Sequence, residues 1–291
     1  MEYTGLRKKF KRIPKHMKKN LAGRTLFITG SSRGIGRAIA LRAAQDGANV
    51  VIAAKSDLPH PILPGTIHSV AEEVVAAGGQ ALAVKLDVKD EHAIQSAVQR
   101  AAEHFGGIDI LVNNASAITL RDTRNLRMVR FDLMFGVNVR GTYACSQACI
   151  PYLLQSDNAH ILNLSPPLNL NPDWFKSHVA YTMSKYGMSM CVLGMAEEFR
   201  EEGVAVNALW PRTVIATAAL NVLDGMVKPE NCRSEAIMAD AAHAILVQDS
   251  RSCSGNFFID QDVLHTEGVT DFEQYAVQQG APLMKDLFLD E

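Results

Sequence analysis

The stretch Arg24-Thr-Leu-Phe-Ile-Thr-Gly-Ser-Ser-Arg-Gly-Ile-Gly36 decides the fold. An apolar run over residues 25–29 predicts a strand, and residues 35–45 have the pattern of a helix. Glycines between a strand and a helix let the backbone approach a pyrophosphate, and the start of the helix offers it unpaired N–H groups. The residues that we expect to contact a dinucleotide therefore lie in this turn: Gly30, Ser32, Arg33, Gly34, Ile35 and Gly36.

Strand-like and helix-like segments alternate along the rest of the chain. Strands are predicted over residues 25–29, 49–53, 81–86, 108–112, 160–164, 204–209 and 256–259. These runs are almost continuously apolar, which is typical of parallel strands covered on both faces. The pattern predicts one doubly wound (Rossmann) α/β domain with a seven-stranded parallel sheet over residues 24–291, preceded by a basic arm over residues 1–23.

Composition restricts the partners. The net charge of −2 argues against a nucleic-acid partner, the five cysteines lack metal-ligand spacing, and no apolar stretch is long enough for an integral membrane segment. Residues 1–24 nevertheless hold nine Lys or Arg and one acid. We interpret this arm as solvated or docked on a neighbouring subunit; contact with a membrane surface and organelle targeting remain open.

Further motifs follow in order and point to one family. Asp87-Val88 closes the third strand, Asn113-Asn114-Ala115 closes the fourth, and Asn138 precedes a Tyr181-Thr-Met-Ser-Lys185 motif. Pro211 follows the sixth strand. Together with the TGxxxGxG spacing of the turn, these motifs resemble the short-chain dehydrogenase/reductase family over residues 24 to about 260. The resemblance implies hydride transfer between a nicotinamide cofactor and a carbonyl or alcohol.

The cofactor is predicted to be NADP(H). An acid after the second strand would bind a ribose 2′-hydroxyl and repel a 2′-phosphate, but this strand ends in Ala54-Lys55-Ser56. Arg33 and Lys55 instead offer cations for a 2′-phosphate. By resemblance, Asp87 and Val88 contact the adenine, Asn114 lies beside the cofactor, and Pro211 and Thr213 contact its nicotinamide end.

Tyr181 and Lys185 are the expected catalytic pair. Four residues apart on a helix, they share one face, and the ammonium should lower the phenol pKa so that Tyr181 serves as acid and base. By resemblance, Lys185 also binds the nicotinamide ribose, Asn138 holds a water in a proton relay, and a serine holds the substrate oxygen. That serine's usual place is taken by Pro166, so we expect Ser165 to fill the role; the alternative is that Ser165 only satisfies backbone groups at the end of the strand.

Several other segments resemble one subgroup of the family, whose animal members are linked to peroxisomes or mitochondria and to lipid metabolism. They include Ser165–Pro172 and Phe288–Glu291, and the resemblance does not reach the sterol-carrier domain that those members carry. The family resemblance implies a homodimer or homotetramer. The substrate is expected to be a small hydrophobic carbonyl or alcohol, because apolar residues lie on segments expected near the nicotinamide: Trp174, Phe175, Leu220, Val222, Leu223 and Met226. The alternative is that these residues pack a lid or a subunit contact.

Two points stay open at this stage. The chain is expected in the cytoplasm or an organelle matrix, including that of mitochondria, because no Ser-Lys-Leu-like ending indicates peroxisomal import. A cofactor-binding regulator with little turnover is the alternative to an enzyme, and the displaced serine is its only support. A membrane or nucleic-acid adaptor that works through the arm is a third reading.

Overall fold

A seven-stranded parallel sheet forms the centre of the protein. The computed structural model describes residues 20–61, 63–218, 220 and 227–290; the arm over residues 1–19 lies outside them. The strands run in the order β3-β2-β1-β4-β5-β6-β7. Their bounds are β1 (Thr25–Thr29), β2 (Asn49–Ala54), β3 (Gln80–Lys85), β4 (Ile110–Asn113), β5 (His160–Asn163), β6 (Ala205–Trp210) and β7 (Phe257–Ile259).

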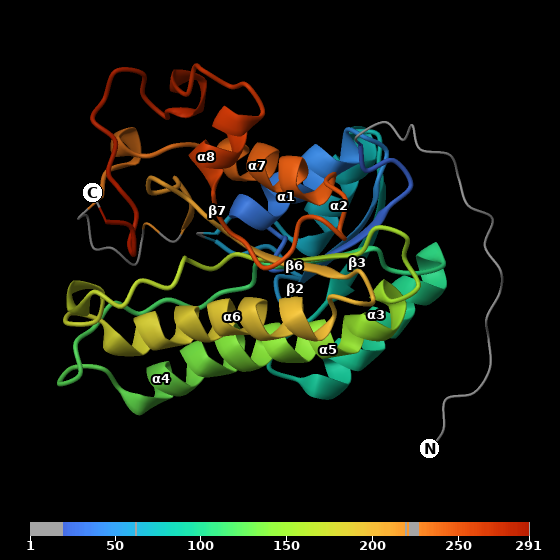
Figure 1. Ribbon diagram of the computed structural model, residues 1–291, viewed down its shortest axis with the longest axis horizontal. Helices are drawn as coiled ribbons and strands as arrows, with labels where there is room; N and C mark the ends of the chain where they lie inside the picture. Colours follow the sequence, from blue (N-terminus) through green and yellow to red (C-terminus); the bar gives the residue numbers. More distant parts are fainter. Residues whose placement is uncertain (1–19, 62, 219, 221–226, 291) are drawn as a thin grey trace.

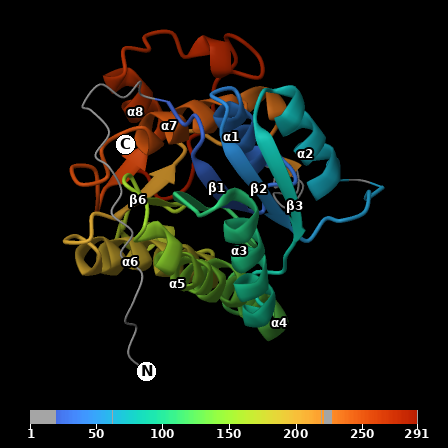
Figure 2. The ribbon, with the colours of Figure 1, turned by 90° about the vertical axis from the view of Figure 1, so that its right-hand side faces the viewer.

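Helices cover both faces of the sheet, as Figures 1 and 2 show. One layer holds α1 (Gly34–Ala44), α2 (Ile67–Ala76), α7 (Ala236–Leu246) and α8 (Asp260–Thr266). The other layer holds α3 (Glu91–Phe105), α4 (Met128–Met134), α5 (Thr142–Leu153) and α6 (Val179–Glu198), with a π-helical turn, η1 (Phe135–Gly141), joining α4 to α5. The predicted doubly wound α/β fold with seven parallel strands is confirmed.

The two layers explain why the strands lack polar alternation. In β1, Leu26 and Ile28 pack into the core on the α1–α7 side, whereas Phe27 packs into the core on the α3–α5 side. Successive side chains of a strand point to opposite faces, so a strand with a helix layer on each face must be apolar at every position. Leu21, just before β1, is also part of the core at 2% exposure, and its N–H donates to Asp46 Oδ2.

The strand order reverses at β1, and this reversal places the site. β2 and β3 lie on one side of β1 and β4 to β7 on the other, so the connections after β1 and β4 diverge and leave a crevice at the carboxyl ends of these strands. Asn114, directly after β4, bridges this point. Its Nδ2 donates to the carbonyls of Thr29 (2.8 Å) and Gly30 (3.1 Å).

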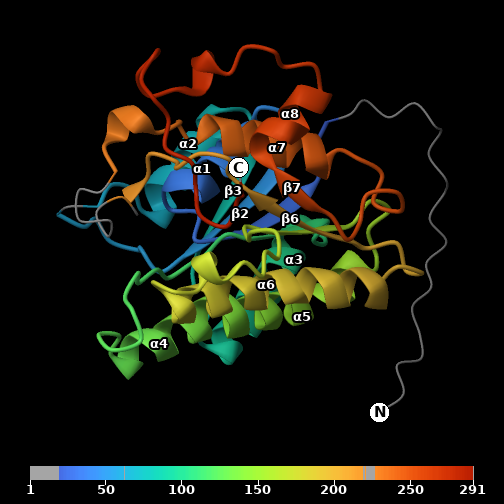
Figure 3. The same ribbon diagram turned by 60° about the vertical axis from the view of Figure 1, so that its left-hand side comes forward.

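The C-terminal segment after α8 folds back over the same end of the sheet (Figure 3). The Asp286 N–H donates to the Arg212 carbonyl at 3.1 Å, and Trp210 Nε1 donates to the Leu287 carbonyl at 2.9 Å. Phe288 is only 1% exposed and has a left-handed backbone with φ of 71°. The last residues are therefore packed against β6 and α6 as part of the domain.

Candidate active site

The glycine turn has the shape of an anion cradle. Gly30 has a φ of +67°, and a Cβ there would lie 2.8 Å from the Ala115 Cα, so only glycine fits. Gly34 also has a positive φ, and a Cβ on Gly36 would lie 2.4 Å from Asn114 Nδ2. The helix α1 starts with no side-chain cap and with no acid in its first turn. Its first N–H groups therefore remain available to a phosphate.

The other residues expected at the cofactor site differ in their burial and contacts. Ser32 is 3% exposed, and Ile35 lines the cavity described below. Asn114 is engaged with the turn, as described above. Val88, 7% exposed, packs against Gly141 of η1, where a Cβ would lie 2.9 Å from Val88 Cγ2.

Two cations lie beyond the carboxyl ends of β1 and β2. Arg33 donates from Nη2 to Ser56 Oγ (2.9 Å) and to the Gly65 carbonyl (3.0 Å). Lys55 Nζ lies 3.7 Å from Asp87 Oδ2. The nearest acid after β2, Asp57, pairs with His68 (2.9 Å) and Lys85 (3.3 Å). Its carboxylate is thus already partnered, while Arg33 and Lys55 are held beside the turn.

Tyr181 and Lys185 are buried on one face of α6, at 5% and 2% exposure. Lys185 Nζ donates to the Leu164 carbonyl at 2.5 Å and lies 5.1 Å from the Trp210 ring centroid. Burial lowers the pKa of Lys185 to about 7, although the nearby Asp286 opposes this shift. Burial therefore makes the charged form of Lys185 energetically unfavourable.

The expected lowering of the tyrosine pKa is not observed. Burial raises the pKa of Tyr181, and Asp286 adds to the shift. The reason is that burial removes the phenolate from water and so disfavours the charged form. The neutral phenol, the form that can donate a proton, is thus favoured in this arrangement.

Asn138 ties three elements together. It is fully buried in η1, and its Nδ2 donates to the Ala117 carbonyl (2.9 Å) and to Ser184 Oγ of α6 (3.0 Å). Its Oδ1 accepts from the Ala117 N–H at 2.7 Å. Both amide hydrogens are therefore used to hold the loop after β4 against α6, and only a second lone pair on Oδ1 is left for a water.

Two predicted hydroxyl groups are buried without a hydrogen-bond partner. Ser165 Oγ and Thr213 Oγ1 each lack one, at residue exposures of 0% and 8%. Neither residue lines the cavity described below, whereas Pro211 does. A buried hydroxyl without a partner carries a desolvation cost that a ligand atom could relieve.

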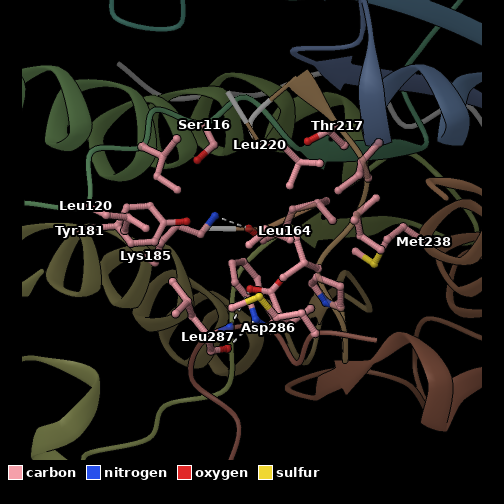
Figure 4. A pocket seen from close by; sticks show the side chains of 18 of the residues that line it. Ser116, Leu120, Leu164, Tyr181, Lys185, Thr217, Leu220, Met238, Asp286 and Leu287 are labelled. Atoms are coloured by element: carbon pink, nitrogen blue, oxygen red, sulfur yellow. Dashed lines mark hydrogen bonds between the residues drawn. The ribbon is translucent and has the colours of Figure 1, made fainter. Parts of the chain in front are cut away.

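A cavity of about 510 Å³ opens beside Tyr181 and Lys185 (Figure 4). This volume suits a small ligand. Its polar lining residues are Asn114, Ser116, Ser177, His178, Tyr181, Lys185, Thr217, Lys285 and Asp286. Apolar side chains from several loops form most of the wall: Ile118, Leu120, Leu164, Leu220, Val227, Met238, Met284 and Leu287.

The apolar residues expected near the substrate do not all line the cavity. Leu220 lines the cavity. Trp174 and Phe175 instead pack in an aromatic cluster, with ring centroids 6.0 Å from Phe288 and 5.6 Å from Tyr186 respectively. Val222, Leu223 and Met226 lie outside the described residues.

Sequence reasoning missed the contribution of the C-terminal segment. Met284, Asp286 and Leu287 line the cavity although they are about a hundred residues from Tyr181 in the chain. The segment contains no motif with a recognisable spacing. The only available signal was the unusual ending from Phe288 onward, which indicated a subgroup but not a contact.

Comparison with known proteins defines the class. The sequence matches the short chain dehydrogenase family over residues 24–225, and the chain belongs to the short-chain dehydrogenase/reductase family. Hydroxysteroid dehydrogenase-like protein 2 of Danio rerio is 63% identical over 270 residues, which are 93% of this chain and 65% of that protein. The chain thus spans just under two thirds of that relative's length. The predicted similarity to this subgroup is confirmed.

Solved structures agree with this assignment. A Xanthomonas campestris protein described as a dehydrogenase has a TM-score of 0.92 and 58% identity, covering 94% of this chain and 100% of its own. A metagenomic short-chain oxidoreductase in complex with NADP has a TM-score of 0.68 and 28% identity, covering 82% of this chain and 97% of its own. The protein is therefore an oxidoreductase by family.

Membrane spans and metal clusters are both absent from the described residues. Over residues 20–61, 63–218, 220 and 227–290, none of the helices combines the length and the apolar composition that a bilayer span requires. In the same described part of the chain, no group of three or more His, Cys, Asp or Glu is arranged to hold a metal ion.

Proposed function

We propose that the protein is an NADP(H)-dependent oxidoreductase that transfers a hydride between the nicotinamide and a carbonyl or alcohol of a hydrophobic, lipid-like substrate. One observation carries the proposal: Tyr181 and Lys185 form the polar wall of a mainly apolar cavity that also reaches Ile35 at the glycine turn. The cofactor, when bound, supplies or accepts the hydride. The residues of the chain bind, orient and move the proton.

The preference for NADP(H) is supported by charge at the end of β2. Arg33 and Lys55 lie beside the turn, and the carboxylate of Asp57 is already paired with His68 and Lys85. A guanidinium and an ammonium attract a 2′-phosphate, whereas a free carboxylate would repel it. Asp87, Val88, Asn114, Pro211 and Thr213 are proposed to complete the cofactor site.

The proton step is assigned to Tyr181. Since burial favours its neutral phenol, Tyr181 can donate a proton to a carbonyl oxygen as the carbonyl is reduced, and the reverse transfer serves alcohol oxidation. Lys185 is proposed to leave the Leu164 carbonyl for the ribose, which would bring its charge to the phenolate that remains. The unpartnered Ser165 hydroxyl is proposed to hold the substrate oxygen, and Asn138 a relay water.

A homo-oligomer is supported by apolar side chains exposed on three helices of one layer. They are Met128 and Val129 of α4, Tyr143 of α5, and Met183, Met190 and Leu193 of α6, each at least 46% exposed. Exposed apolar groups clustered on neighbouring helices indicate a contact surface. We propose a homodimer or homotetramer in the cytoplasm or an organelle matrix, with the basic arm over residues 1–23 preceding the catalytic domain.

Titration with nucleotides tests the cofactor, and a carbonyl screen tests the substrate class. The purified protein should bind NADPH more tightly than NADH, and should oxidise NADPH with aldehydes and ketones at rates that rise with chain length until the cavity is filled. Tight NADPH binding with no turnover across the series would favour the regulator. Binding of neither nucleotide would contradict the proposal.

A further inference from the structure

We propose that Asp286 determines substrate specificity by making the cavity accept chains with an uncharged reacting end and reject chains with a carboxylate. The inference deepens the proposed function and rests on it for the location of the reacting end beside Tyr181. Its test, however, uses binding alone and requires neither nicotinamide nor turnover.

The position of Asp286 is fixed by its neighbours. Its own N–H donates to the Arg212 carbonyl, and its Oδ1 accepts from the Leu287 N–H at 2.7 Å. Two residues further on, the buried Phe288 ring holds the segment among the aromatic side chains of α6 and β6. The carboxyl group is thus held at the same cavity as Tyr181 and Lys185 (Figure 4).

Charged groups at the cavity are few among the described residues. Those that line it are Lys185, Lys285 and Asp286, and burial lowers the pKa of His178, so that its ring is uncharged at neutral pH. Lys285 is exposed and its Nζ donates to the Asp290 carbonyl at 3.0 Å. Lys185 and Asp286 are therefore the charges that an entering substrate meets.

These two groups balance each other. Burial raises the pKa of Asp286 to about 7 and lowers that of Lys185 to about 7. Both the ammonium–carboxylate state and the state in which the proton has moved to the carboxylate carry no net charge. A neutral aldehyde, ketone, alcohol or amide can therefore enter without creating an unbalanced charge.

A carboxylate is a different case. It would add a negative charge to an apolar cavity where Lys185, the buried cation among the described lining residues, already interacts electrostatically with Asp286. An unpaired buried charge is costly. Removal of the Asp286 charge would reverse this, because Lys185 would then lack a counter-ion and could pair with an entering carboxylate.

Calorimetric titration with octanamide and octanoate tests the inference at neutral pH on cofactor-free protein. The two probes match in length and shape and differ in charge. The wild-type protein should bind octanamide at least tenfold more tightly than octanoate. Asp286→Asn keeps an Oδ1 acceptor for the Leu287 N–H and should reduce that ratio at least tenfold, mainly through tighter octanoate binding.

Asp290→Asn is the matched control. It removes a carboxylate from the same segment, but one that accepts from Asn169 and Trp174 outside the cavity, so the ratio should not change. Equal wild-type affinity for the two probes would overturn the inference, and so would an unchanged ratio in Asp286→Asn. Binding of neither probe would refute the cavity as a site for such chains, while NADPH titration reports separately on the proposed function.

Discussion

Replacement of Phe288 by alanine should release the C-terminal segment. The ring is 1% exposed, and its centroid lies 5.4 Å from that of Tyr186, 5.8 Å from Trp210 and 6.0 Å from Trp174. Truncation of a buried phenylalanine to alanine typically costs about 3–5 kcal/mol. Since the segment is held mainly by the contacts of this one ring, we expect the loss to appear first as local opening and to be near the lower value, about 3 kcal/mol.

Glycine at this position provides an internal control. Glycine usually destabilises relative to alanine by about 0.5–1 kcal/mol because it has more freedom in the unfolded chain. Phe288 has a φ of 71°, however, and a left-handed backbone costs a residue with a Cβ about 1–2 kcal/mol. Relief of this strain should offset the usual penalty, so that Phe288→Gly is at least as stable as Phe288→Ala.

Urea unfolding followed by tryptophan fluorescence is the assay. Both tryptophans of the chain, Trp174 and Trp210, flank Phe288, so the signal reports local release of the segment. Leu289→Ala, at a partly buried neighbour, should cost less than Phe288→Ala. An alanine variant within about 1 kcal/mol of wild type would refute the anchoring role. A glycine variant a full ~1 kcal/mol less stable than the alanine variant would refute the strain at Phe288.

Three further predictions concern the cofactor, acid stability and assembly. Lys55→Gln should weaken NADPH binding about tenfold and NADH binding little. Lys89→Gln is the control and should affect neither, although the ammonium groups of Lys55 and Lys89 lie 3.7 Å and 3.8 Å from the same Asp87 oxygen. Equal losses of affinity for both nucleotides in Lys55→Gln would contradict a contact between Lys55 and the 2′-phosphate. Burial lowers the pKa of His160 from 6.5 to about 4, so its contribution to stability is present above pH 6.5 and is lost as the pH falls through 4. Acid titration of unfolding should therefore show about 3 kcal/mol less loss over this window in His160→Gln, and parallel curves would contradict it. Met190 and Leu193 are 61% and 50% exposed on α6, so replacement of both by glutamate should convert the oligomer to a monomer in light scattering; a monomeric wild type would refute the proposed contact.

Local pattern was enough to predict the sheet. The predicted strand over 25–29 matches β1 without a shift, and the other six strands agree within two residues at either end. Strands β1, β2, β4, β5 and β6 are almost wholly buried, so apolar composition alone identified them, whereas β3 and β7 are partly exposed. The turn from Gly30 to Gly36 was equally predictable, because glycine is required there by positive φ and by close backbone contacts.

The cavity was not predictable in the same way. Tyr181 and Lys185 could be paired from their helical spacing, but the pKa of Tyr181 depends on how deeply the helix is buried, and this shift went in the opposite direction from the one expected. Asp286 and Leu287 reach the cavity only because Phe288 packs on α6 and β6. Contacts between residues so far apart along the chain leave no periodic pattern in the sequence.

NADPH-dependent reduction by Tyr181→Phe, compared with Tyr186→Phe, tests the central claim most directly. Both tyrosines are buried on α6, but the Tyr186 hydroxyl donates to the Asn169 carbonyl, whereas Tyr181 lines the cavity. Loss of the proton donor should lower kcat by about 10²–10⁴-fold in Tyr181→Phe while NADPH affinity is retained, and Tyr186→Phe should stay within tenfold of wild type. Full activity in Tyr181→Phe would contradict the account.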